Sequence, residues 1–237
     1  MDCRESFTYS AIAGREDKPV NWVSFYDSLR FVNWLENGQP VGPQGTDTTE
    51  DGAYTITEMG IVDNSITRNP GASIFLTSED EWYKAAYYDP LSAKYFASTA
   101  SSDVWTICAV PGATPNTANC DQVVGDVGDV TDVGSYTASE SPNGTFDQGG
   151  NVSEWNEAIL PTFPSTRGHR GGGYLFNFAA LLAQSRPTTG LPSTQSGHIG
   201  FRVASVPEPT AGLLQMTCLL CLAYLRSRSA GRAGSQI

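Results

Sequence analysis

The glycine-rich stretch from Gly144 to Asn177 constrains the fold of this chain more than any other feature. It contains the segments GTFDQGGNVSEW (144–155) and RGHRGGGY (167–174), in which single polar residues stand beside large aromatic ones. Glycine at this density indicates backbone that adopts positive φ or that other groups approach closely. Asp147 followed by a tight Gly-Gly turn offers the oxygen ligands that calcium prefers. On residue types alone, a glycine-rich turn between two strands, with Trp155 in the core, is the favoured interpretation.

The composition indicates a loop-rich, acidic protein. The chain has 237 residues, enough for one large or two small domains with a substantial core. Its 24 glycines and 14 prolines, with only 16% charged residues, suit a fold with little regular structure. The formal net charge of −11 argues against nucleic acid as a partner and is compatible with a cation-binding surface.

The segment from Pro19 to Gly38 predicts a strand, a turn and a helix. Ser24 followed by Asp27 has the spacing of a capping box, which satisfies free amide groups at a helix start. Apolar residues at helical spacing follow, beginning at Phe25, and the Asn-Gly pair ending at Gly38 favours termination. We expect the aromatic side chains of this helix to lie in the core.

A second helix is expected further along the chain, after two short strands. Apolar and polar residues alternate at 54–57, as in a short strand, and apolar residues cluster at 73–76, which we expect to be a second short strand. Thr77 and Ser78 are the candidate N-caps of the helix, and acids stand in its first turn, where they favour the helix dipole. The helix should end before Pro90.

The region 91–140 is expected to be irregular and contains two features with open alternatives. Cys108 and Cys120 could form a disulfide in an oxidising compartment, or they could be two free cysteines in a loop. Carboxylates recur every third residue at Asp126, Asp129 and Asp132, which suits either a calcium-binding turn or an exposed acidic loop.

Five ordered motifs carry a family resemblance. They are PVNWVSFYDSL (19–29), LTSEDEWYKAA (76–86), DQGGNVSEW (147–155), RGGGY (170–174) and GHIGFRV (197–203). Together they resemble the signature series of the formylglycine-generating enzyme, or sulfatase-modifying factor, domain. The resemblance implies an α+β, loop-rich, C-type-lectin-like fold with low regular secondary structure over residues 19–205.

The resemblance also implies where catalytic residues should stand. Active members of this family use a cysteine pair just after the RGGSW-like segment to bind copper and oxidise a substrate cysteine. The corresponding positions here are Phe176 and Leu181, and no cysteine lies between Cys120 and Cys218. Because thiolate is the ligand that Cu(I) selects, we expect neither copper nor formylglycine-generating oxidase activity, and we assign no catalytic residue.

Iron-dependent sulfoxide synthases that share this domain use three histidines, but this chain has only His169 and His198. The two could contribute to an iron site with a carboxylate such as Glu154 or Asp147. The alternative, which we favour, is that His198 is a loop residue and His169 a surface residue in a turn.

By the family pattern, a structural calcium ion should be held by Asp147 and by main-chain carbonyls near Gln148, Gly150 and Val152. A second, weaker site falls around Asn119, Cys120, Asp126 and Gly128. Glu154, Arg170 and Arg202 are expected to be buried ion-pair partners, with Arg202 pairing with Glu154. Trp155, Gly171 and Gly172 complete the expected structural set.

The two ends of the chain differ from the domain between them. Residues 1–18 form an irregular start without the pattern of a signal peptide, and we expect the domain to be N-terminally truncated. The tail, 206–237, has a Pro-Glu-Pro break, an apolar segment at 211–225 and a cluster of arginines, and this order is similar to the PEP-CTERM sorting signal. The similarity implies export, transient membrane anchoring by the C-terminal apolar helix and processing by an exosortase-type enzyme.

Two functions from different classes therefore remain open. The favoured one is a non-catalytic binding or structural module, stabilised by calcium, at the cell envelope or in a secreted matrix, with an unknown extracellular ligand. The alternative is a metal-dependent oxidoreductase of the same family that uses a non-cysteine site.

Overall fold

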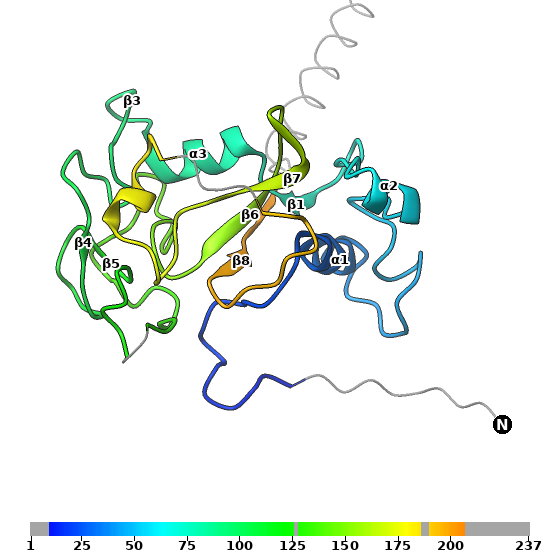
Figure 1. Cartoon of the computed structure of the whole chain (residues 1–237), viewed down its shortest axis with the longest axis horizontal. Coiled ribbons are helices and arrows are strands. Elements are labelled where there is room, and N and C mark those ends of the chain that lie inside the picture. Colours follow the sequence, from blue (N-terminus) through cyan, green and yellow to red (C-terminus); the bar gives the residue numbers. More distant parts are fainter. Residues whose placement is uncertain (1–9, 126–127, 186–189, 207–237) are drawn as a thin grey trace, which may run out of the picture. The chain divides into compact units, whose positions relative to one another are not determined.

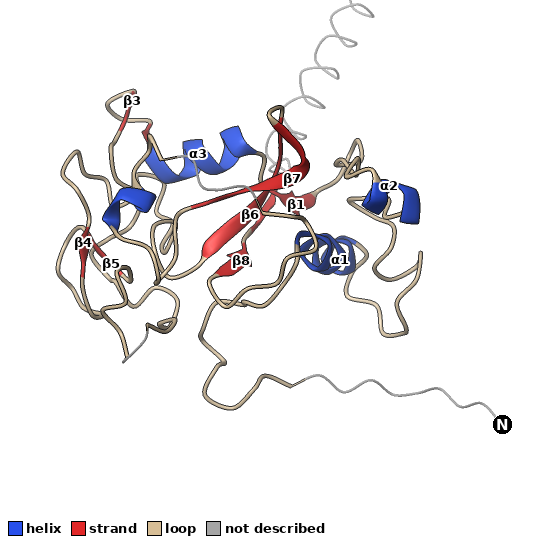
Figure 2. Ribbon diagram, viewed as in Figure 1, coloured by secondary structure: helices blue, strands red, loops and turns tan. Residues whose placement is uncertain are grey.

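The computed structural model describes residues 10–125, 128–185 and 190–206. It has few helices and short strands joined by long loops (Figures 1 and 2). The elements are α1 (Phe25–Glu36), α2 (Glu58–Val62), β1 (Ile74–Leu76), α3 (Glu79–Tyr87), β2 (Tyr88–Asp89), β3 (Lys94–Tyr95), β4 (Ile107–Cys108), β5 (Thr117–Ala118), β6 (Ser153–Leu160), β7 (Phe163–Arg170), the 3-10 helix η1 (Phe178–Leu181), β8 (Ile199–Phe201) and β9 (Val203–Ser205). The predicted α+β, loop-rich fold is confirmed.

A three-stranded sheet with the order β7-β6-β8 joins the glycine-rich motifs. β6 pairs with β7 in the antiparallel sense and with β8 in the parallel sense. Trp155 stands opposite His169 on one face, and Glu154 stands opposite Arg170 on the other. The motifs around residues 147–155, 170–174 and 197–203 are therefore adjacent because they are neighbouring strands and the loops that leave them.

The two longer helices pack on opposite faces of this sheet (Figure 1). From α1, the ring of Phe25 meets that of Trp155 edge to face, with centroids 6.3 Å apart. From α3, the indole N–H of Trp82 donates to the Glu154 carboxylate at 2.6 Å. Both tryptophans are fully buried, and together they anchor a helix to each side of β6.

Both predicted helices form with the expected caps. Ser24 caps α1 and Ser78 caps α3, each in a capping box, with Asp27 and Glu81 as the third residues. α1 ends at Asn37 as its C-cap, and α3 ends three residues before Pro90.

Two of the predicted strands are wrong. Residues 19–23 contain no strand, because Trp22 takes a positive φ of 59° and turns the chain. At 54–57 only a single bridge, Tyr54 to Arg68, is present. There the side chain of Asn33 satisfies the backbone, accepting from the Tyr54 amide and donating to its carbonyl, both at 2.8 Å. The expected strand at 73–76 is present as β1, which pairs with β9.

Cys108 and Cys120 form a disulfide, which decides between the alternatives left open by the sequence. Cys108 is the last residue of β4, which pairs with β5, and Cys120 is fully buried. The disulfide thus fixes the long irregular region next to η1, since Cys120, Ala118 and Leu181 share one hydrophobic cluster.

The chain divides into two units, 1–204 and 205–237. The apolar segment predicted at 211–225, with the rest of the tail beyond Val206, lies outside the described residues. Within the part that is described, none of the helices has the length and apolarity that a bilayer crossing requires.

Candidate functional site around the glycine-rich motifs

Asp147 lies in the loop before β6 in a conformation that only a few residue types adopt readily. Its φ is 57°, a left-handed value that aspartate, asparagine and glycine tolerate best. One carboxylate oxygen accepts a hydrogen bond from the Gly134 amide at 2.6 Å. Burial raises the pKa of Asp147, and the nearby Glu154 charge raises it further, against the opposing effects of the Gly134 N–H and Arg202. The site therefore favours a cation or a proton beside this carboxylate.

A small polar cavity of about 10 Å³ borders Asp147. That is close to the smallest volume that holds a water molecule, so a single ion or water is the largest occupant it accepts without rearrangement. Its walls are formed mainly by hydroxyl-bearing and small residues: Thr99, Ala100, Thr117, Ala118, Tyr136, Ser139, Thr145, Asp147, Gln148 and Gly149. A carboxylate with hydroxyl neighbours is a donor set that fits a hard cation such as calcium.

Of the other three residues predicted for this calcium site, one lines the cavity and two do not. Gln148 lines it, but its side chain is engaged: its oxygen accepts from the Thr145 hydroxyl, and its amide donates to the Trp82 carbonyl at 3.3 Å. Gly150 and Val152 are not among the residues that line it. The sequence analysis did not include the hydroxyl group of Thr145, which stands two residues before Asp147, or that of Thr99, which comes from a distant loop.

Gly150 and Gly171 explain why this loop needs glycine. A Cβ on Gly150 would lie 2.5 Å from the Asn119 carbonyl oxygen, and one on Gly171 would lie 2.5 Å from the Gln148 carbonyl oxygen. Both residues also have positive φ, 85° and 92°. The Gly150 amide donates to the Gly171 carbonyl at 2.9 Å, so the two motifs are joined by backbone packing that side chains would block.

The second predicted site is assembled differently from the expectation. Asn119 donates to the Asp129 carbonyl at 2.7 Å, while its own side-chain oxygen is buried without a partner in the described residues. Cys120 is in the disulfide. Gly128 packs against the Tyr174 ring so closely that a Cβ at this position would lie 2.7 Å from a ring carbon. Asp126 lies outside the described residues.

The unsatisfied oxygen of Asn119 is the observation that fits a cation at the second site. Next to it, the Asn151 side chain exchanges hydrogen bonds with the backbone of Thr131, and the hydroxyl of Thr131 is also buried without a partner in the part of the chain described. Buried polar oxygens without partners are uncommon in proteins and require an explanation. Asp129 and Thr131 were not in the predicted set, although the period-three carboxylates pointed to their segment.

Ion pairs lie on the face of the sheet that packs against α3. The Arg202 guanidinium binds Glu154 with two hydrogen bonds, at 2.5 and 2.6 Å, and donates to the Phe146 carbonyl at 3.0 Å. Burial lowers the pKa of Arg202, but the Glu154 carboxylate raises it more, so that it lies above its ordinary value. Arg170 pairs with Glu79 at 2.5 Å, which fastens the end of β7 to the start of α3.

The residues that follow the second glycine motif are mainly apolar and range from exposed to fully buried. Leu181 is fully buried in η1 beside the disulfide cluster, where a Cβ on Gly172 would lie 3.0 Å from its side chain. Phe176 is partly buried and meets the His198 ring edge to face, with centroids 5.3 Å apart. Phe178, at the start of η1, stacks on the exposed ring of Trp105.

A comparison with family models matches residues 2–206 to the sulfatase-modifying factor enzyme 1-like domain. The chain belongs to this family. The match covers all five motifs identified in the sequence.

Two solved structures have a fold similar to that of this chain. Treponema denticola variable protein 1 is 20% identical, with a TM-score of 0.55, and the alignment covers 85% of this chain and 76% of that protein. CarF is 24% identical, with a TM-score of 0.56 over 86% of this chain and 74% of its own. At these identities the likeness concerns the fold alone. A search of curated proteins gave no match.

Of the two histidines of this chain, His198 has the predicted environment and His169 does not. His169 is not a surface residue: it is 5% exposed, lies in β7 and faces the Trp155 ring. The prediction failed because the glycines around it suggested a turn, whereas they serve strand and loop packing. Burial, with a smaller contribution from His198, lowers the pKa of His169 to about 4, so it is neutral at pH 7. His198 does lie in a loop, and its Nδ1 is 2.8 Å from the Ser196 hydroxyl.

Across residues 10–125, 128–185 and 190–206, no three His, Cys, Asp or Glu side chains gather closely enough to hold a metal ion together. A calcium site at Asp147 would depend instead on hydroxyl and main-chain oxygens. Of these two kinds of oxygen, main-chain carbonyls are common calcium ligands.

Proposed function

We propose that this protein is a non-catalytic binding or structural module of the sulfatase-modifying factor family, stabilised by calcium. The observation that carries the proposal is the replacement of the family's cysteine pair by Phe176 and Leu181. A phenyl ring and an isobutyl group offer neither a thiolate for copper nor a redox-active sulfur.

The packing around these positions supports the same function. Leu181 is fully buried against the disulfide cluster, so its side chain serves the core. Beside it, Trp105 and Phe178 stack with ring centroids 4.9 Å apart and an angle of 18° between their planes. Trp105 is 63% exposed, and exposed aromatic groups of this kind are suited to contact a ligand.

Calcium in this proposal is structural, and Asp147 is its principal ligand. The raised pKa of the buried carboxylate and the polar cavity beside it favour a bound cation. An ion there would connect the loops around residues 99, 134 and 147, which have little regular structure of their own. It would add stability to the folded chain in proportion to its occupancy.

The proposal also includes export. The tail at 206–237 is similar to a PEP-CTERM sorting signal, so we infer transient anchoring at the membrane and release to the cell envelope or matrix after cleavage. Mass spectrometry of protein from the native host tests this inference. A mature chain that lacks the apolar segment at 211–225 would support it, and an intact C-terminus in extracellular protein would contradict it.

Calcium binding can be tested with two variants that both tolerate positive φ. Asp147→Gly removes the carboxylate, whereas Asp147→Asn keeps one oxygen and loses the charge. Thermal denaturation with added calcium or with a chelator should show calcium-dependent stabilisation of the parent protein, a smaller effect in the asparagine variant and none in the glycine variant. Equal stabilisation of all three would refute the role of Asp147.

Elemental analysis of the purified protein separates this function from its alternative. Calcium without a stoichiometric transition metal supports the binding module. Stoichiometric copper or iron would support a metal-dependent oxidoreductase that uses a non-cysteine site.

A further inference from the structure

The rings of Trp105 and Phe178 form a stacked pair that is open on one side. Their centroids are 4.9 Å apart and their planes meet at 18°, so Phe178 covers one face of the indole. Trp105 is nevertheless 63% exposed, whereas Phe178 is partly buried. The indole face opposite Phe178 is therefore accessible to a ligand from solvent.

The segment that carries Trp105 directs its apolar side chains outward. Exposure alternates along 105–108, which ends with β4: Thr106 and Cys108 are buried or partly buried, whereas Trp105 and Ile107 are exposed. This alternation places Trp105 and Ile107 on the same outer side of the segment. Large apolar groups gathered on one exposed side are typical of a binding surface.

The stacked pair is fixed by the structure beneath it. The Asn116 side chain donates to the carbonyls of Val104 and Trp105, at 3.2 and 3.0 Å, and so holds the backbone that carries the indole. Cys108 of β4 and Ala180 of η1 pack against the same buried cluster. Because both rings belong to segments that are fixed in this way, a ligand would order little of the protein when it binds.

No charged side chain accompanies the two rings along the chain. The segments that carry them, 104–120 and 171–185, contain no Asp, Glu, Lys, Arg or His, in a chain with a net charge of −11. Beyond the ends of the first segment, Asp103 is paired with Lys94 at 3.0 Å, and Asp121 is a single acid. An anionic ligand would find no counter-charge in these segments and would be repelled by the acidic protein as a whole. The surface therefore suits an uncharged ligand.

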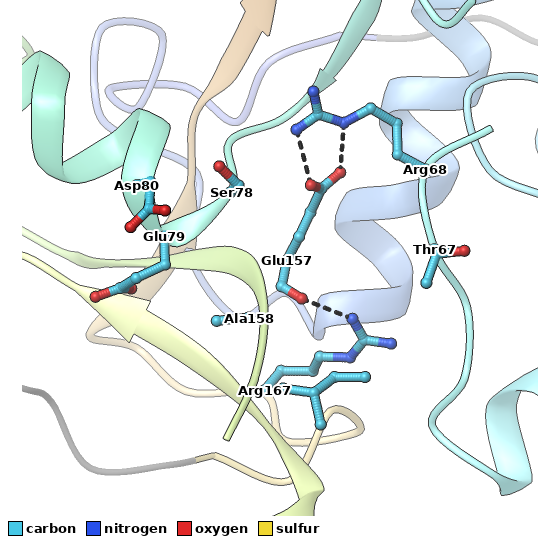
Figure 3. A pocket seen from close by; sticks show the side chains of 9 residues that line it. Thr67, Arg68, Ser78, Glu79, Asp80, Glu157, Ala158 and Arg167 are labelled. Carbon is cyan, nitrogen blue, oxygen red and sulfur yellow. Dashed lines mark hydrogen bonds and ion pairs between the residues drawn. The ribbon is translucent and has the colours of Figure 1, made fainter. Parts of the chain in front are cut away.

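A cavity of about 400 Å³ beside the start of α3 and the β6–β7 hairpin offers a different environment (Figure 3). There, Arg68 holds the Glu157 carboxylate through two hydrogen bonds, at 2.8 and 2.7 Å, and Arg167 donates to the Glu157 carbonyl at 2.9 Å. These groups satisfy one another and leave little capacity for a ligand. Neither ring of the stacked pair lines this cavity, so the pair is a separate and more open contact surface.

A sugar ring with equatorial hydroxyl groups matches an open indole face. In β-linked glucose the hydroxyl groups lie at the edge of the ring, and both of its faces present only C–H groups, which are weakly positive. The face of an aromatic ring is electron-rich and attracts these C–H groups, while the hydroxyl groups remain in water. Such a contact requires neither a counter-charge nor a deep pocket.

We propose that the stacked pair binds a neutral matrix polysaccharide of β-linked glucose-type units, with one sugar ring lying on the free face of Trp105. This inference rests on the proposed function, because it names the ligand class of the binding module. A single stacked ring supports weak binding, with a Kd of about 1 mM for a short oligosaccharide. A polymer that engages many copies of the protein would be held more tightly than the short oligosaccharide.

Titration of the purified full chain with cellotetraose, followed by NMR of the tryptophan indole N–H groups, tests the proposal. Cellotetraose should shift the Trp105 signal saturably. A matched probe with the same rings and linkages but a carboxylate at each C6 position should bind at least about tenfold more weakly, because it brings negative charge to an acidic protein. A proline hexapeptide with blocked termini represents an apolar peptide and should bind more weakly than cellotetraose.

Three variants locate the ligand, with binding measured from the resonances of the sugar and folding from Tm. Trp105→Ala should weaken cellotetraose binding at least about tenfold, and Trp105→Phe, which keeps a smaller ring, should lose less. Trp22→Asn is the matched control, because Trp22 is 65% exposed and asparagine tolerates its positive φ of 59°. This control should bind cellotetraose as the parent does.

The proposal is overturned if cellotetraose causes no saturable shift at Trp105, or if the carboxylated probe binds as tightly. It is also overturned if Trp105→Ala binds as the parent does, or if Trp105→Phe loses as much as Trp105→Ala. A proline hexapeptide that binds at Trp105 as tightly as the sugar would indicate a peptide surface and would equally reject it.

The proposed function can fail separately from this ligand class. A protein that ignores cellotetraose and contains no stoichiometric transition metal rejects the polysaccharide alone. Stoichiometric copper or iron would reject the non-catalytic module, whatever the result with the sugar.

Discussion

Replacement of Glu154 by glutamine should destabilise the protein strongly, although the side chain keeps nearly the same size and shape. The Glu154 carboxylate accepts from both Arg202 and the Trp82 indole, and its side chain is 5% exposed. Glutamine keeps one oxygen but loses the charge that compensates Arg202. It also places an amide N–H group against a donor.

The magnitude follows from the burial of the pair. Breaking one partner of a buried ion pair costs about 3–5 kcal/mol. Because the Arg202 side chain is 24% exposed, water compensates part of the loss, and we expect the lower end, about 3 kcal/mol. For a folded unit of about 200 residues this corresponds to a fall in Tm of about 6–12 °C.

Urea denaturation of the parent and the variant measures this cost as a change in the free energy of unfolding. Asp132→Asn is the control, since it breaks the Lys18–Asp132 pair, in which Asp132 is 61% exposed, and should cost no more than about 1 kcal/mol. The double variant Glu154→Gln with Arg202→Met should recover part of the loss, because no charge remains unpaired. A cost below about 1 kcal/mol for Glu154→Gln alone would refute this reasoning.

Two further predictions concern the irregular half of the chain. Replacing both Cys108 and Cys120 by serine opens a loop with a sequence separation of 12 and should lower the free energy of unfolding by about 3 kcal/mol, measured by denaturation against the oxidised parent. An unchanged midpoint would contradict this expectation. Because the pKa of Asp147 is raised in the folded state, the folded protein binds the carboxyl proton of Asp147 more tightly than the unfolded chain does. The stability that this protonated carboxyl group contributes is therefore lost as pH rises from about 4 through the raised pKa. In chelator, Asp147→Asn should therefore gain stability relative to the parent over that pH range, and added calcium should restore the parent; parallel pH profiles would reject this assignment.

The sequence predicted the features that depend on local chemistry. The caps at Ser24 and Ser78 follow from residue type and spacing, and the structure contains both. The family followed from five short motifs in order. Three of them form one sheet and the loops that leave it, and the other two contain the first turns of α1 and α3.

The sequence could not predict features that depend on partners distant along the chain. No local pattern indicates that the Asn33 side chain replaces strand pairing at Tyr54, or that His169 is buried beneath Trp155. Thr99 lines the cavity beside Asp147, but it lies in a loop whose sequence contains no recognisable motif. The register shift between Trp155 and Ile159 of β6 can be recognised only when the pairing of β6 with β7 is known.

The central claim is that Phe176 and Leu181 remove the family's copper chemistry. The most direct measurement is incubation of the purified, copper-supplemented protein with a cysteine-containing peptide in the presence of oxygen and a reductant, followed by peptide mass spectrometry, with an active formylglycine-generating enzyme as the positive control. We predict that the cysteine is not converted to formylglycine by this protein, whereas the control converts it. Copper-dependent formation of formylglycine by this chain would contradict the account.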